Sequence, residues 1–236
     1  MYTIKYKPTD KMSDLICDNY TLLQVLSRFG LPLGFGDQTV TEVCNQHQVD
    51  CATFLAVVNF VAEESDRMAT EEVKELSIPS LMSYLHQAHH YFLDFQFPTI
   101  RCKLIEALDS SSPNEAPLNE VSFLIIQFFD AYVAEVRKHM AFEDQNVFSY
   151  VEKLLAGQVT GGYRISKFAR NHDQIDSKLT DLKNILIKYY PAKKNNPLLN
   201  ATLFDIFSCE KDLISHNRVE DFLFVPAVLS LEKEEA

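Results

Sequence analysis

The sequence predicts an all-α protein in which a small helical N-terminal domain precedes an up-down four-helix bundle. Three observations favour this fold class. The chain of 236 residues contains only 6 glycines, about a third of ordinary usage, so it turns seldom. Hydrophobic residues make up 47% of the chain, enough for a packed core, which excludes a disordered chain. Beyond residue 75, apolar residues recur with helical spacing in four long stretches.

Residues 1–65 form the predicted N-terminal domain. Its expected helices cover residues 10–29, 40–46 and 51–62. Thr39 and Glu42 have the spacing of a capping box, in which each side chain caps a free backbone N–H group of the other residue. Asp50 is the expected N-cap of the following helix. The polar stretch 63–70 reads as a linker.

Residues 75–236 form the predicted bundle. Pro79 suits the first turn of a helix, and Asn196-Pro197 supplies an N-cap followed by a proline at the first helical position. The four expected helices cover about residues 79–108, 118–156, 165–190 and 197–231. Four such helices joined by short loops are typical of an up-down bundle.

The charge and the cysteine content limit the classes of function that the protein can have. The chain has 22 basic and 33 acidic residues and a net charge of −11, which disfavours nucleic acid as a partner. We find no secretory signal and no apolar run of the length that a membrane span needs. Five cysteines without a Cys-x-x-Cys pair indicate reduced thiols. We therefore expect a cytoplasmic protein that does not contact membranes.

Polar residues occupy positions in the apolar seams of all four predicted bundle helices. They are His86 and His90 in the first helix, His139 and Glu143 in the second, His172 in the third, and His216 and Glu220 in the fourth. Burying an unpaired carboxylate is costly, so the two glutamates need a partner. In both His-x-x-x-Glu pairs the side chains lie one helical turn apart and can aim at one point.

These residues supply enough ligands for two metal ions. Imidazole and carboxylate together suit iron or manganese, zinc also fits, and the lack of thiolates argues against copper(I) or a cluster. Each residue also has a simpler interpretation, because a histidine on an apolar face can be a satisfied core residue and His-x-x-x-Glu can be a surface pair. His89 points about 100° away from His90 on a regular helix, so we expect it at the surface or rim.

The chain resembles the hemerythrin-like iron–sulfur cluster repair proteins, also described as regulators of cell morphogenesis and nitric-oxide signalling. The resemblance rests on four stretches: His89-His90-Tyr91 with Pro98 eight residues beyond His90, Lys138-His139-Met140-Ala-Phe-Glu143-Asp144, Arg170-Asn171-His172-Asp173, and Ser215-His216-Asn-Arg-Val-Glu220 with Pro226 six residues later. The position of Pro98 selects His90 over His86, which becomes its neighbour. Glu135 matches a further family acid near the metal site, although it could equally be a solvated helix residue.

The resemblance implies a di-iron centre of two non-haem Fe ions with bridging glutamates. Carried over residue by residue, its metal ligands are His90, His139, Glu143, His172, His216 and Glu220. It also implies that the protein repairs damaged iron–sulfur proteins under nitrosative or oxidative stress. Two mechanisms fit this role, namely release of iron to a damaged cluster and binding and reduction of NO.

One departure from the family favours another function. The family usually has Cys-Cys-Gly-Gly in the N-terminal domain, where this chain has Gly34-Phe35-Gly36-Asp37. Without the adjacent thiols, a hemerythrin-like module that only binds or senses O₂ or NO becomes the alternative. A metal-free helical adaptor is a third interpretation. The apolar loop around Phe35 is a candidate surface for a homodimer.

Overall fold

The computed structural model describes residues 5–63, 73–109, 120–158, 164–167, 173–190 and 195–234. Within these ranges the chain forms helices and no β-strand, and Lys11 and Thr39 form an isolated β-bridge. The predictions of an all-α fold and of a helical bundle are therefore confirmed. No helix in the described ranges combines the length and the apolar character that crossing a membrane requires.

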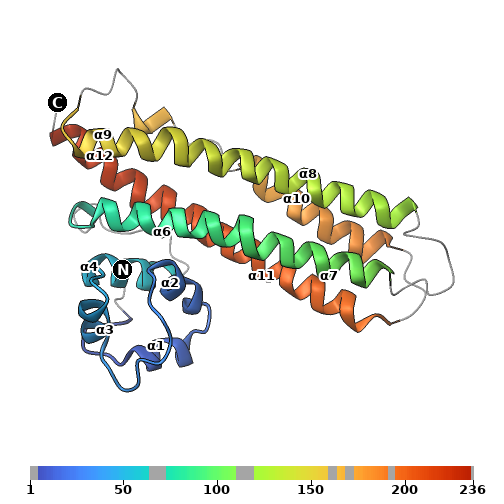
Figure 1. Ribbon diagram of the computed structural model, residues 1–236, viewed down its shortest axis with the longest axis horizontal. Helices are drawn as coiled ribbons and strands as arrows, with labels where there is room; N and C mark the ends of the chain where they lie inside the picture. The colour runs from blue at the N-terminus through green and yellow to red at the C-terminus, as the bar shows by residue number, and fades with distance from the viewer. Residues whose placement is uncertain are drawn as a thin grey trace. The chain divides into compact units, whose positions relative to one another are not determined.

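The helices fall into an N-terminal group and a long C-terminal group (Figure 1). The N-terminal helices are α1 (Met12–Asp18), α2 (Leu22–Arg28), α3 (Val40–Gln46) and α4 (Cys51–Glu63). The longer α-helices that follow are α6 (Ile78–His90), α7 (Phe97–Asp109), α8 (Glu120–Phe142), α9 (Ser149–Leu155), α10 (Asp173–Asn184), α11 (Pro197–Val219) and α12 (Val225–Glu234). Between them lie the π-helical turns η1 (Tyr91–Gln96), η2 (Glu143–Phe148), η4 (Ile185–Tyr189) and η5 (Glu220–Phe224), and the 3₁₀ turn η3 (Ile165–Lys167).

The chain divides into two compact units. Unit 1 contains residues 1–88, 148–169 and 215–236, and unit 2 contains residues 89–147 and 170–214. Several long helices contribute one end to each unit, so the boundary between the units does not coincide with loops.

Unit 2 is built on α7, α8, α10 and most of α11, which run alongside one another (Figure 1). Charged pairs join each helix to its neighbours around the bundle. They are Arg101–Asp130 between α7 and α8, Glu135–Lys178 between α8 and α10, Lys183–Glu210 between α10 and α11, and Lys103–Asp205 between α11 and α7. Because each pair is partly exposed, each adds little stability, but together they give the order of an up-down bundle.

Aromatic side chains fill the interior of unit 2. Phe97 on α7 meets Tyr132 and Phe129 on α8 edge-on, at ring-centroid distances of 5.8 and 6.3 Å. All three rings are almost completely buried. Burial of rings of this size contributes a large share of the hydrophobic stabilisation of a helical core.

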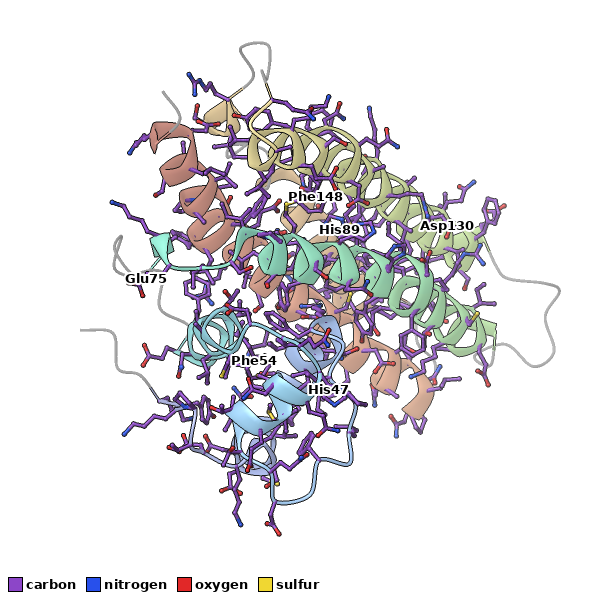
Figure 2. The ribbon with its side chains drawn as sticks, turned by 60° about the vertical axis from the view of Figure 1, so that its left-hand side comes forward. His47, Phe54, Glu75, His89, Asp130 and Phe148 are labelled. Atoms are coloured by element: carbon purple, nitrogen blue, oxygen red, sulfur yellow. The ribbon has the colours of Figure 1, made fainter. Side chains whose placement is uncertain are left out.

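Two N-terminal helices of unit 1, α3 and α4, begin where the sequence predicts. Thr39 and Glu42 form the reciprocal capping box at the start of α3. At the start of α4, the Asp50 carboxylate accepts a hydrogen bond of 2.8 Å from the backbone N–H of Thr53. The helices pack around Phe54, whose ring is fully buried (Figure 2). The predicted helix over residues 10–29 is instead two short helices, α1 and α2.

The N-terminal helices also contact the later segments of unit 1. Phe29, after α2, lies 5.1 Å from the ring of Tyr84 on α6. The guanidinium of Arg218 lies 4.9 Å from the centre of the Phe60 ring on α4, within the range of a cation–π contact. Phe35, which we expected to be exposed, is half-buried, whereas Leu33 in the same loop is 69% exposed.

A buried carboxylate joins three segments of unit 1. Glu232 on α12 is only 6% exposed. Its Oε1 atom accepts hydrogen bonds from the Tyr150 hydroxyl at 2.5 Å and from the backbone N–H of Ile165 at 2.8 Å. Glu232 therefore anchors α12 to α9 and to η3.

Replacing Glu232 by leucine should lower the free energy of unfolding by about 3 kcal/mol, because it leaves two buried donors without their acceptor. The glutamine variant keeps a carbonyl oxygen that can accept both hydrogen bonds, so it should lose clearly less. Urea unfolding followed by circular dichroism measures both changes. Equal losses in the two variants would show that the hydrogen bonds of Glu232 do not stabilise this unit.

Candidate metal centre

Two of the predicted ligand carboxylates occupy equivalent positions in their helices. Glu143 is the first residue of η2, and Glu220 is the first residue of η5. A third π-helical turn, η1, starts immediately after His90. Single π-turns inside α-helices are rare and occur frequently at functional sites. Three such turns therefore begin at or directly after predicted ligand positions.

In the first bundle helix the structure places the side chain of His89 in the interior and that of His90, the predicted ligand, at the surface. The side chain of His90 is 57% exposed, and its Nδ1 atom lies 3.1 Å from Asp94 on the same helix. His89, expected at the surface or rim, is only 2% exposed (Figure 2) and faces a buried carboxylate. His90 therefore forms an ordinary surface pair, and His89 takes the interior position.

The π-turn η1 is the physical reason why His89, and not His90, faces the interior. Counting back from Phe97 through Leu93 in regular helical steps leads to His90. In the structure the buried residues Phe92 and Phe97 are five positions apart, because η1 contains an additional residue. Upstream of η1 the buried face therefore shifts by one position. Counting forward from Leu81 and Leu85 in steps of four would have identified His89.

Unit 2 brings two histidine side chains onto one carboxylate. The Nε2 atom of His89 lies 3.1 Å from Oε2 of Glu143. The Nε2 atom of His139 lies 2.6 Å from Oε1 of the same residue. Glu143 is completely buried, and the His139 side chain is 16% exposed. Two imidazoles from different helices thus converge on a single carboxylate in the interior.

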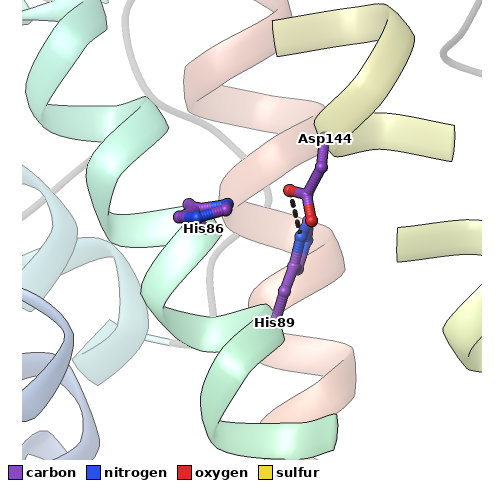
Figure 3. A group of neighbouring side chains, drawn as sticks. All are labelled: His86, His89 and Asp144. Carbon is purple, nitrogen blue, oxygen red and sulfur yellow. Dashed lines mark hydrogen bonds and ion pairs between the residues drawn. The ribbon is translucent and has the colours of Figure 1, made fainter. Parts of the chain in front are cut away.

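The opposite nitrogen of His89 has its own partner. Its Nδ1 atom lies 2.8 Å from Oδ1 of Asp144, as the dashed line in Figure 3 marks. Asp144 directly follows Glu143, so adjacent residues hold the two nitrogens of one ring. Sequence reasoning did not select His89 or Asp144, although Asp144 belongs to the motif that contains His139 and Glu143.

The surroundings of His89 favour a positive charge on its ring. Burial alone lowers the pKa of His89, but the hydrogen bonds that its ring donates to Asp144 and Glu143, with the negative charge of both carboxylates, raise this pKa to about 9. In the metal-free protein the imidazole is therefore protonated at neutral pH. This position is a site for a cation between two carboxylates.

The remaining predicted residues have different surroundings. In unit 1, His216 and Glu220 are both buried, with exposed fractions of 1% and 0%. His86 lies one turn before His89 on α6, is half-buried, and has its ring 6.5 Å from the ring of Phe148. Glu135 is exposed and forms an ion pair with Lys178. His172 lies outside the described residues.

The donor set of unit 2 fits a divalent metal ion. Imidazole nitrogens and a carboxylate are the ligands that iron, manganese and zinc accept in proteins. The carboxylate of Glu143 offers one oxygen toward each imidazole, which is the arrangement expected of a shared or bridging ligand. Glu143 and His89 are buried and His139 is partly buried, so most solvent is excluded and a positive ion would compensate the charge of Glu143.

Substituting His89 should weaken metal binding, whereas substituting the adjacent His90 should not. We expect the alanine variant of His89 to bind Fe(II) at least about tenfold more weakly than the wild-type protein, because it loses an imidazole at the buried carboxylate. The alanine variant of His90 should bind as the wild type does, because that side chain points to solvent. Anaerobic competition with a coloured chelator measures both affinities. The reverse order of the two variants would restore the assignment made from sequence.

Comparison with protein-family models identifies a family that this chain matches. Residues 80–228, more than half of the chain, match the family model described as the hemerythrin HHE cation binding domain. The match covers α6 to α12 and includes each of the metal-binding candidates described above. A search of curated proteins finds no sequence that matches this chain.

Proposed function

Because this chain belongs to the hemerythrin HHE cation-binding family, we propose that it holds two non-haem iron ions and acts in the response to nitrosative or oxidative stress. The observation that carries the proposal is the convergence of His89 and His139 on the buried carboxylate of Glu143. A family built to bind cations and a buried set of nitrogen and oxygen donors lead independently to a metal centre.

We propose six ligands for the two ions. Unit 2 supplies His89, His139 and Glu143. We assign the other three positions to His172, His216 and Glu220, which would hold the ions together with the residues of unit 2. The burial of His216 and Glu220 supports this assignment, because a metal ion can hold imidazole and carboxylate ligands in the interior of a protein. The family match, which extends through both segments, supports it further.

The surrounding residues limit what can reach the metals. An iron pair with open coordination positions supplies the capacity to bind O₂ or NO and to exchange electrons with it. Glu143 and His89 are shielded from solvent by the aromatic and aliphatic side chains of the interior. His139, which retains partial exposure, marks the side from which O₂ or NO would approach.

The proposed role is the restoration of damaged iron–sulfur proteins. In this role the centre either gives up iron to a damaged cluster or binds and reduces NO. The partners are iron–sulfur proteins that have lost iron, and the site of action is the cytoplasm, where the five free thiols of this chain persist. The acidic net charge of −11 repels nucleic acid and favours no anionic surface as a partner.

A second candidate function is a module that binds or senses O₂ or NO without turnover. The loop Gly34-Phe35-Gly36-Asp37 favours it, because the family's adjacent cysteines would lie there. Gly34, at the position of the first cysteine, has a φ of +98°, a backbone conformation in which a cysteine side chain would be strained. A redox or iron-transfer step that uses paired thiols in this loop is therefore unsupported in this protein.

Anaerobic purification followed by metal analysis tests the first part of the proposal, with two irons per chain as the expected result. Stopped-flow mixing of the iron-loaded protein with NO then separates the two functions. Formation of nitrous oxide, or transfer of iron to an apo-protein that requires a cluster, supports repair. Reversible binding with neither outcome supports the module. Protein without bound metal after purification from iron-rich medium would contradict both.

A further inference from the structure

We propose that Asp144 is a positioning residue for the metal centre, which holds the ring of His89 so that its Nε2 atom faces the cation. This inference rests on the proposed function. It concerns a residue that is not itself a proposed ligand and that acts through the hydrogen bond to Nδ1 of His89.

The two nitrogens of the His89 ring have different partners. One ring nitrogen, Nε2, points at Glu143 in the completely buried interior, and the other, Nδ1, points at Asp144. Consecutive residues of a helix point in clearly different directions, and Glu143 and Asp144 are the first two residues of η2. Adjacent carboxylates can therefore reach two nitrogens of one ring only when the ring lies between them. His89 has this position, which fixes both the location and the rotation of its ring.

The hydrogen bond also determines which nitrogen can bind a metal. Neutral imidazole carries its proton on one nitrogen and offers the lone pair of the other. A carboxylate at Nδ1 keeps the proton there, so the lone pair of Nε2 is directed into the interior beside Glu143. A charged acceptor at Nδ1 also makes Nε2 a stronger electron donor, as carboxylates do for metal-bound histidines in general.

The same helix contains a matched pair that lacks this role. His90 and Asp94 also join an imidazole Nδ1 to an aspartate oxygen, at 3.1 Å. Their side chains are 57% and 64% exposed, whereas those of His89 and Asp144 are 2% and 29% exposed. The chemistry of the two pairs is the same, so the surface pair reports what an aspartate–histidine contact contributes without a buried centre.

The test compares three variants of the full chain, D144A, D144N and D94N, with Fe(II) as the probe under anaerobic conditions. Chelator competition measures Fe(II) affinity, and thermal melts of the metal-free proteins check folding. Proton NMR of the Fe(II)-loaded proteins detects the exchangeable N–H of the bound imidazole, which a merely structural contact would not affect. The D144A variant should lose about 10–100-fold in affinity. The D144N variant, which keeps an acceptor oxygen, should lose less and shift the N–H resonance, and D94N should match the wild type.

Wild-type affinity in D144A would overturn the inference and leave the proposed function intact, provided that the alanine variant of His89 loses metal. The inference would also fail if D144N retained the wild-type N–H resonance, because that proton would then not be donated to residue 144. Absence of Fe(II) binding by the wild-type protein would contradict the proposed function itself and this inference with it, an outcome that the wild-type measurement alone identifies.

Discussion

Replacing Glu143 by glutamine should weaken Fe(II) binding by more than about a hundredfold while the helices remain formed. Loss of a residue that only supports a metal ligand typically costs 10–100-fold in affinity, and Glu143 faces both His89 and His139 directly. The neutral amide has one acceptor oxygen in place of two and no charge to balance a cation. Metal analysis after dialysis, together with circular dichroism, measures the two parts of this expectation.

Glu152 provides the control for this variant. It lies on α9 and is exposed to solvent, so the same glutamate-to-glutamine change should leave Fe(II) affinity unaltered. Wild-type iron content in the Glu143 variant would remove that carboxylate from the ligand set. A loss of helical signal would instead show that Glu143 is needed for folding, and the D144N variant would then be the better probe of the centre.

The metal-free protein should lose stability as the pH rises from about 6.5 to about 9. Because the folded protein raises the pKa of His89 above its ordinary value of 6.5 to about 9, folding favours the protonated ring. This contribution is fully present below pH 6.5 and is lost as the pH rises through 9. A difference of this size between the two pKa values corresponds to about 3 kcal/mol in the free energy of unfolding.

Urea unfolding of chelator-treated protein at about pH 6 and about pH 9.5 measures this loss. The glutamine variant of His89 is the control, since it cannot titrate in this range but retains an amide that can donate hydrogen bonds. Other groups that titrate affect both proteins, so the difference between them isolates His89. If the wild-type protein and the variant lost equal stability, His89 would not be the charged partner of Glu143 and Asp144.

Local signals in the sequence were sufficient to predict where several helices begin. The capping box of Thr39 and Glu42 is present in the structure as predicted. Asn196 caps α11 by accepting a hydrogen bond from the backbone N–H of Leu199, and Pro197 is the first helical residue. Such signals depend on side chains within three residues of one another, so they can be identified without knowledge of the tertiary fold.

Composition alone could not show where the first N-terminal helix is interrupted. Asn19 separates α1 from α2, and its side-chain oxygen accepts hydrogen bonds from the backbone N–H and the hydroxyl of Thr21. An asparagine that bonds to the backbone two residues ahead forms a local turn and competes with the helix. The residue type allowed this turn, but its choice over a continuous helix depends on packing of the two halves.

His90 was wrongly predicted to face the interior for a different reason, namely the assumption of an unbroken helical repeat. A regular period of 3.6 residues, extended across η1, places every upstream side chain one position away from its true face. A π-turn forms where the side chains before it and after it pack better with one additional residue between them. No residue type between Tyr91 and Gln96 is a local signal for such a turn. Glu143 and Glu220 were identified correctly as buried residues because each begins its π-turn and was therefore counted before the additional residue.

The additional residue in η1 lets one continuous helix direct both His89 and Phe97 into the interior, which a regular helix with this spacing would not do. It acts as a phase shift of about a third of a turn between the stretch that presents His89 and the stretch that presents Phe97. Relatives that lack such an insertion would place the corresponding histidine at another offset from the downstream proline. An alignment counted from Pro98 would then pair an interior side chain of one protein with a surface side chain of the other. The position of the π-turn must therefore be matched before the ligands of two relatives are compared.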